Sequence, residues 1–183
     1  MSLTQEGLIQ NILDATGMTD CNTKGLPSKI SPLGTDADGS RRKERWKYAS
    51  IIGMMMYISS NAHLEIQFAV YQCAHFTHCP RYSHKEAVNQ ICRYLQGVKD
   101  KGMTFQPNTN IQIDCYVDSN FSVLWNYDND QDPVCVKSKT SYVLTLGVCP
   151  IQWSSKIQSK IALSTTEAEF IALSQAMREL IPL

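Results

Sequence analysis

Residues 111–118 read Ile-Gln-Ile-Asp-Cys-Tyr-Val-Asp, and this stretch decides the fold. Apolar residues alternate with more polar ones, and a period of two is typical of a strand with one buried face. Further strands are predicted at 141–146 and 150–156, and the short turn around Gly147 predicts that they pair as a hairpin. A helix is predicted from Ser164 almost to the last residue. We therefore expect an antiparallel sheet with one helix.

Upstream of residue 111 the apolar spacing is helical. Helices are predicted at 41–59, 62–77 and 83–98. The third has the clearest start, because Ser83 and Glu86 have the spacing of a capping box.

The N-terminal 40 residues divide into a helix and a connection. Thr4 is predicted to cap a short helix that ends at Gly17. Residues 18–40 hold three glycines and two prolines and few large apolar residues, which favours an extended linker. We expect an α+β chain with four regions: 1–17, the linker 18–40, a helical region 41–105, and a sheet with one helix at 111–183.

Composition limits the classes of protein. The chain has 183 residues, of which 43% are hydrophobic and 19% charged, so a folded core is expected. No apolar run approaches the roughly 18 residues of a membrane span. The seven cysteines are scattered and form no Cys-x-x-Cys pair, which favours reduced thiols and an intracellular, cytoplasmic or nuclear location.

The charge of the chain also limits which partners are expected. The formal net charge is zero, so nucleic-acid binding is expected to be weak. One basic segment nevertheless interleaves cations with an aromatic residue that could stack on a base. Its residues are Arg41, Arg42, Lys43, Arg45, Trp46 and Lys47. The open alternative is a solvated helix start with Trp46 packed inward.

The predicted final helix carries two glutamates with different expected roles. Glu167 has capping-box spacing from Ser164, so it is expected to accept backbone hydrogen bonds at the helix start. Glu169 shares a helical face with Leu173, Ala176 and Leu180, which predicts that it faces the sheet.

Asp118 comes at the end of the first predicted strand. If its carboxylate met that of Glu169, the pair would suit magnesium or manganese, and two such metals can hydrolyse a phosphodiester. The open alternative is that Asp118 starts a turn and Glu169 only accepts a hydrogen bond.

Four blocks of residues together resemble a known family. They are residues 116–121 (Tyr-Val-Asp-Ser-Asn-Phe), 138–142 (Ser-Lys-Thr-Ser-Tyr), 151–156 (Ile-Gln-Trp-Ser-Ser-Lys) and 164–170 (Ser-Thr-Thr-Glu-Ala-Glu-Phe). The blocks resemble the ribonuclease H region of copia-type retrotransposon Pol polyproteins. The resemblance implies that Asp118 and Glu169 are catalytic ligands of magnesium or manganese, and that an RNA–DNA hybrid is the partner.

The resemblance continues upstream. Residues 48–57 and 83–97 are similar to the thumb and connection at the C-terminal end of the reverse transcriptase, and residues 3–5 and 17–18 to the end of the polymerase domain. It implies a helical thumb and connection region followed by a truncated ribonuclease H-like fold of three antiparallel strands and one helix. The remainder of the polyprotein is then an expected partner.

Departures from the family pattern predict an incomplete enzyme. Asn120 stands where the family has a second aspartate. In this resemblance the polymerase carboxylates and a third nuclease aspartate lie outside the chain, so we expect little or no nuclease activity. A non-catalytic nucleic-acid-binding module and a repurposed interaction protein remain open alternatives.

Two weaker metal patterns have plainer explanations. Cys73, His75, His78 and Cys79 crowd one helix end without a second pair of zinc ligands. Residues 128–132 hold alternate aspartates like the start of a calcium loop, but Pro133 takes the position that needs glycine.

Overall fold

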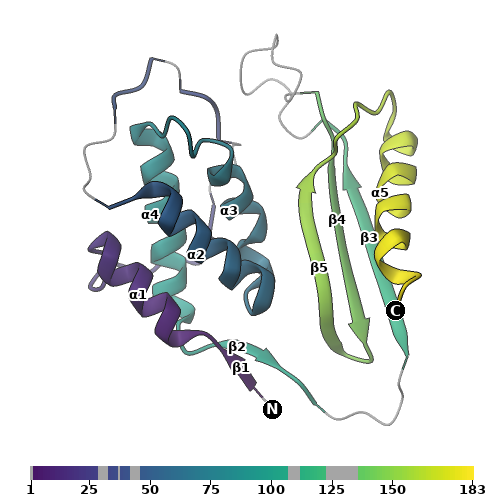
Figure 1. Cartoon of the computed structure of the whole chain (residues 1–183), viewed down its shortest axis with the longest axis horizontal. Helices are drawn as coiled ribbons and strands as arrows, with labels where there is room; N and C mark the ends of the chain where they lie inside the picture. The colour runs from purple at the N-terminus through teal and green to yellow at the C-terminus, as the bar shows by residue number, and fades with distance from the viewer. Residues whose placement is uncertain (1, 29–32, 37, 42–45, 107–111, 123–135) are drawn as a thin grey trace. The chain divides into compact units, whose positions relative to one another are not determined.

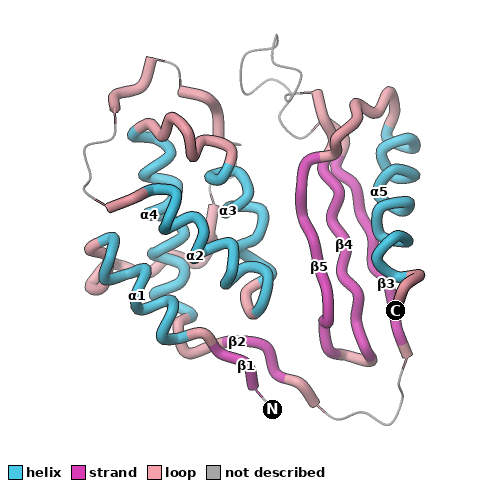
Figure 2. The backbone as a smooth tube through the Cα atoms, viewed as in Figure 1, coloured by secondary structure: helices cyan, strands magenta, loops and turns pink. Residues whose placement is uncertain are grey.

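The computed structural model describes all residues except 1, 29–32, 37, 42–45, 107–111 and 123–135. Within the described residues it is an α+β structure, as predicted, with five α-helices and two antiparallel sheets. The chain forms two compact units, Met1–Thr104 and Phe105–Leu183, which are described separately (Figures 1 and 2). None of the described helices is both long and apolar enough to cross a bilayer.

Unit 1 is helical with one small two-stranded sheet. Its elements are β1 (Ser2–Thr4), α1 (Glu6–Thr16), α2 (Tyr48–Asn61), the 3-10 helix η1 (Leu64–Ile66), α3 (Gln67–Ala74), α4 (Tyr82–Val98) and β2 (Gly102–Thr104). β1 and β2 pair antiparallel, with Leu3 opposite Met103. Close packing at this pair requires glycine at 102, where a Cβ would lie 2.1 Å from the Leu3 carbonyl oxygen.

The core of unit 1 joins helices from both ends of the unit. Large side chains of α1, α2 and α4 are fully buried in it, and α3 adds smaller ones. They include Ile9, Ile12, Leu13, Met55, Ile58, Ile91 and Leu95. The apolar spacing of the sequence predicted these faces because residues three and four apart share one side of a helix.

Several predicted helix starts in unit 1 were wrong. α1 begins after Gln5, because Thr4 belongs to β1; Gly17 ends the helix as predicted, with a left-handed φ of 69°. α2 begins at Tyr48 rather than at Arg41. The predicted 62–77 helix is shorter, since η1 and α3 together end at Ala74.

Unit 2 is a three-stranded sheet with one helix on it. Its elements are β3 (Ile113–Asn120), β4 (Lys139–Leu146), β5 (Cys149–Ile157) and α5 (Thr165–Leu180). The strand order is β3-β4-β5, all antiparallel, and Gly147 forms the hairpin turn with a φ of 59°. The three predicted strands, the hairpin and the final helix are thereby confirmed.

One face of this sheet is covered by α5, which lies over β3 and β4 (Figure 1). The core between them consists, among the described residues, of Tyr142, Leu144 and Ala176, flanked by Cys115, Val117 and Leu180. Alternation along β3 places Cys115 and Val117 on the covered face and Tyr116 and Asp118 on the other.

Candidate functional site

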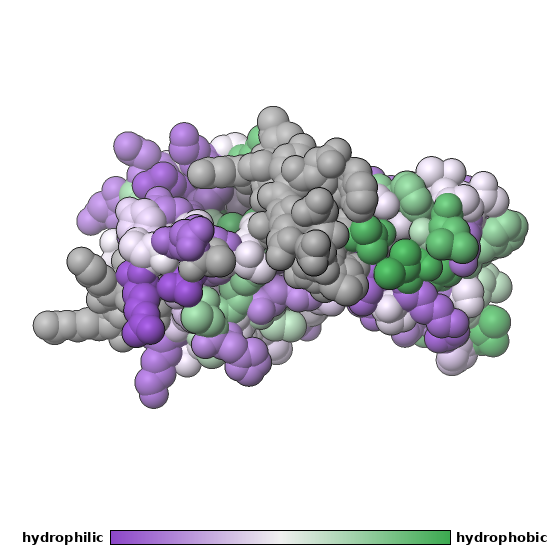
Figure 3. All heavy atoms as spheres, turned by 90° about the horizontal axis from the view of Figure 1, so that it is seen from above, coloured by the Kyte–Doolittle hydropathy of each residue, from purple (hydrophilic) through white to green (hydrophobic). Residues whose placement is uncertain are grey.

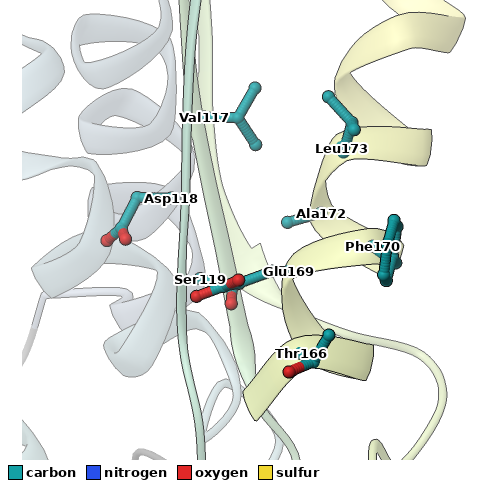
Figure 4. Close-up of a pocket in the computed structure, with 8 residues that line it drawn as sticks. All are labelled: Val117, Asp118, Ser119, Thr166, Glu169, Phe170, Ala172 and Leu173. Atoms are coloured by element: carbon teal, nitrogen blue, oxygen red, sulfur yellow. The ribbon is translucent and has the colours of Figure 1, made fainter.

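The candidate site of unit 2 is a pocket between β3 and the first half of α5. Its volume is about 350 Å³. It is lined by Val117, Asp118, Ser119, Thr166, Glu169, Phe170, Ala172 and Leu173 (Figure 4). Both residues that the sequence singled out as carboxylates, Asp118 and Glu169, are therefore among those that line one pocket.

A capping box fixes the start of α5, as predicted. The backbone N–H of Glu167 donates to Ser164 Oγ over 3.1 Å. The Glu167 carboxylate in turn accepts from the N–H of Leu163 over 2.8 Å. Glu167 thus stabilises the helix end, because the first amides of a helix lack partners within it.

The side of α5 that faces the sheet differs from the prediction. Ala168, Ala172 and Ala176, spaced four residues apart, are fully buried against the strands. Of the predicted stripe, Ala176 is buried and Leu180 packs against the core, whereas Glu169 and Leu173 lie beside the buried face and are exposed. Small alanine side chains let the helix approach the sheet closely, whereas a larger or charged side chain on this face would hold it away.

The structure does not bring Asp118 and Glu169 together. Figure 4 shows the Glu169 side chain pointing from α5 toward β3, while the Asp118 side chain points away from α5 on the far side of the strand. This follows from the alternation of β3, because Val117 points toward the helix and its neighbour must point the other way. The two carboxylates therefore do not come together in this arrangement, contrary to the expectation from the sequence.

On its own face of the sheet, Asp118 lies near a cation. It is opposite Ser141 in the register of β3 with β4, and Asn120 is opposite Lys139. Burial lowers the pKa of Lys139, and the nearby Asp118 carboxylate opposes that shift. Asp118 therefore has an electrostatic partner from β4.

This arrangement does not fit a metal pair. Divalent cations held close together need several carboxylate oxygens on one side of a cleft. The described residues contain no cluster of three or more His, Cys, Asp or Glu side chains that could hold a metal. Whether either carboxylate binds a metal singly stays a prediction.

A buried glutamine, which the sequence analysis did not single out, organises this end of unit 2. Gln158 is 1% exposed, and its Nε2 donates to Thr140 Oγ1 over 3.0 Å and to the carbonyl of Ala168 over 2.9 Å. Its backbone N–H donates to the carbonyl of Ser138. Gln158 therefore ties the first turn of α5 to β4. A lone glutamine between two elements carries no periodic signal, so only the structure reveals it.

The basic segment is described in part. Arg42, Lys43, Glu44 and Arg45 lie outside the described residues. Arg41 and Lys47 are exposed. Trp46 is half-buried against the core of unit 1 and stacks on Tyr48, with ring centroids 6.1 Å apart. Trp46 thus packs inward, as in the alternative to base stacking.

The cysteines and histidines near the end of α3 do not form a metal cluster within the described ranges. Cys73 is buried, and burial raises the pKa of its thiol to about 12. Residues 128–132 and Pro133, with their calcium-like pattern, lie outside the described residues.

Comparison with known proteins places the chain in a family. It is 31% identical to the retrovirus-related Pol polyprotein from transposon TNT 1-94 of Nicotiana tabacum and 27% identical to that from transposon RE2 of Arabidopsis thaliana, each over 98% of the chain. The chain belongs to the copia-type retrotransposon Pol polyproteins. This Pol segment spans 13% and 12% of the two polyproteins, respectively.

A shorter relative matches the Pol segment over most of its own length. The secreted RxLR effector protein 161 of Plasmopara viticola is 30% identical over 132 residues, which is 72% of the chain and 87% of the relative. No family model matches the chain. No solved structure matches it either.

Proposed function

We propose that this Pol segment joins the end of a reverse transcriptase to the first half of a ribonuclease H-like domain and contacts RNA–DNA hybrids within the polyprotein. The observation that carries the proposal is the β3-β4-β5 sheet with α5 on one face. These elements contain the four blocks that resemble the ribonuclease H region, in the order of that region. The remainder of the polyprotein is the proposed partner, in the cytoplasm or nucleus.

The proposed segment is catalytically incomplete by itself. The side chains of Asp118 and Glu169 lie on opposite sides of β3, so they cannot both coordinate one magnesium or manganese ion. Asn120, near the end of the same strand, supplies a neutral amide in place of a further carboxylate. Metal binding by this segment is therefore proposed to be weak or absent.

Hybrid binding is proposed to be weak and electrostatic. The chain has no net charge, so attraction to phosphates must come from local cations. The basic segment, residues 41–47, is the proposed source, and its exposed Arg41 and Lys47 are suited to phosphate contacts.

A cleavage assay tests the catalytic part of the proposal. The full chain is incubated with a labelled RNA–DNA hybrid and magnesium or manganese, beside Asp118→Asn and Glu169→Gln variants. We expect no cleavage above that of the two variants. Metal-dependent cleavage that both substitutions abolish would overturn the proposed incompleteness.

A binding titration tests the hybrid part. Each phosphate contact that is lost should reduce the slope of log affinity against log salt by about 1. We expect measurable hybrid binding at low salt and a smaller slope for the double variant Arg41→Ala, Lys47→Ala. Asp14→Ala, which removes a charge elsewhere, is the control. Absence of binding at low salt would reject the nucleic-acid role.

One observation favours a second candidate. The chain is similar to most of a relative that is named as a secreted effector, which favours a repurposed interaction module as the second candidate. A repurposed interaction module would show no salt-dependent hybrid binding and no cleavage, so the two assays together separate it from the first proposal.

A further inference from the structure

The outer edge of β3, on the side away from β4, has no partner strand among the described residues. In the order β3-β4-β5, all eight residues of β3 pair with β4, and the other edge is left open. Alternate N–H and C=O groups of an edge strand point away from its neighbour, and an extended segment can bind to them as a further strand. The outer edge of β3 is therefore long enough to pair with a short extended segment.

The pocket of unit 2 lies beside this outer edge. Of the described residues, those that line it belong to β3 and α5, and none belongs to β4 or β5. Toward the other side of the sheet, Glu179 of α5 accepts from Gln152 of β5 over 2.8 Å. The flank of α5 that carries Glu169 and Leu173 thus lies toward the outer edge of β3. The apolar side chains that line the pocket are Val117, Phe170, Ala172 and Leu173.

The two faces of β3 differ in their chemistry. Cys115 and Val117 lie on the face that α5 covers, next to the apolar lining of the pocket. Asp114, Tyr116 and Asp118 lie on the other face, where Tyr116 is 64% exposed. Between neighbouring strands, a carboxylate or an aromatic ring stabilises a cation that lies opposite it. A strand added to β3 is therefore favoured when its apolar side chains lie on the α5 side and its cations lie on the other.

We propose that the outer edge of β3 binds an extended basic segment of a partner protein, in which apolar side chains alternate with lysine or arginine. The main chain of the segment pairs with β3, and its cations lie opposite Asp114, Tyr116 and Asp118. One apolar side chain enters the pocket, whose volume of about 350 Å³ is ample for a valine or a leucine. Glu169 points from α5 toward β3 and adds negative charge beside the same edge (Figure 4). This binding does not depend on the proposed binding of hybrids.

Charge favours this partner over other occupants of the edge. β5, the other edge strand among the described residues, carries Lys156 and no carboxylate, so it attracts a basic segment less than β3 does. Pairing between two copies of β3 would bring the carboxylates of Asp114 and Asp118 close to those of the second copy, and like charges across strands are destabilising. Nucleic-acid phosphates are disfavoured in the same way. Lys139 lies near Asp118 and offsets part of its charge, so both aspartates enter the test.

Peptide binding to the full chain tests the proposal. The probe is a fluorescently labelled peptide, Thr-Lys-Val-Arg-Val-Lys-Thr, whose three cations share one face when it is extended. In dilute solution we expect saturable binding by fluorescence anisotropy, which weakens as salt is added. Bound peptide should slow hydrogen exchange of β3 amides and leave β5 amides unchanged. The control peptide, Lys-Lys-Arg-Thr-Val-Val-Thr, has the same composition without the alternation and should bind several-fold more weakly.

Variants locate the charges that attract the peptide. The double variant Asp114→Asn, Asp118→Asn keeps the size of both side chains and should bind the peptide about threefold to tenfold more weakly. Glu179→Gln removes one charge on the other side of α5, and it is the matched control that should bind as the unchanged chain does.

Four results would overturn the proposal. They are absence of saturable binding, equal binding of the two peptides, unchanged affinity in the double aspartate variant, and protection of β5 in place of β3. Outward β3 amides that are already protected without peptide, at every dilution, would also overturn it, because another segment of the chain or a second copy would then occupy the edge.

Discussion

Replacing Leu144 by alanine should weaken unit 2 selectively. Leu144 is fully buried at the centre of β4, where it packs between the sheet and α5. Removing a buried leucine side chain costs about 2–5 kcal/mol, against roughly 5–15 kcal/mol for the whole stability of a typical domain. Because the described core of unit 2 has few large side chains, we expect the substitution to remove a third or more of its stability.

Hydrogen exchange measures this loss in each unit separately. A loss of 2 kcal/mol should speed exchange of the most protected β4 and β5 amides about 30-fold. Leu95→Ala is the matched control, because Leu95 is equally buried in α4 of unit 1. We expect each substitution to affect its own unit. Less than threefold faster exchange in Leu144→Ala, or equal loss of protection in α4, would refute this reasoning.

Four other outcomes are expected. Burial raises the pKa values of Cys73 and Cys92 to about 12, so at pH 8 a thiol reagent should label exposed Cys79 before these two; mass spectrometry that finds Cys73 labelled as fast would contradict this. The same raised pKa values stabilise the fold below the ordinary value near 9, so melting temperatures should fall as pH rises from 9 toward 12. Ser164→Ala should cost about 1 kcal/mol by thermal melting, because it removes the cap of α5, and an unchanged melting temperature would count against that cap. Phe170 is 68% exposed beside β3, an edge strand among the described residues, so sedimentation should show self-association that Phe170→Glu reduces, whereas a monomer at every concentration would reject this contact.

Surface hydropathy agrees with the last expectation. Several large apolar side chains of the α5 region are exposed, and Figure 3 shows hydrophobic residues at the surface of this part of the chain. They are Leu163, Phe170, Leu173, Met177 and Ile181. Apolar side chains gathered along one helix favour contact with another surface.

The sequence predicted the elements of unit 2 because each has a strong local signal. The alternation of 111–118 predicted β3, and Gly147 predicted the hairpin turn. Ser164 and Glu167 predicted the start of α5, because both capping bonds lie within a few residues. Local hydrogen bonds and side-chain periods suffice for such features.

The faces of the elements were harder to predict. The apolar alternation of β3 places Cys115 and Val117 on the packed face and Asp118 on the other face. The pattern of the strand itself therefore opposed the expectation that Asp118 meets a residue of the covering helix. On α5, Ala176 and Leu180 of the predicted stripe pack against the sheet, but close packing selected Ala172 rather than Leu173 beside them. The separation of Asp118 from Glu169 follows from the alternation of β3.

Contacts between distant residues also decided the helix starts in unit 1. Ser83 and Glu86 match a capping box locally, but the box forms two residues earlier, with His84 Nδ1 accepting from the backbone N–H of Arg81. The bond from His84 to Gly34, fifty residues away, favours that register. β1 and β2 were missed for the same reason, since three-residue strands have no measurable period.

Manganese binding is the most direct test of the central claim, that the carboxylates of Asp118 and Glu169 lie on opposite sides of β3. Calorimetric titration should be made on the full chain and on Asp118→Asn and Glu169→Gln. We predict weak manganese binding, and each of the two substitutions should weaken it independently of the other. A tight stoichiometric site that either substitution alone abolishes would contradict the claim, because it would require both carboxylates to hold the same metal.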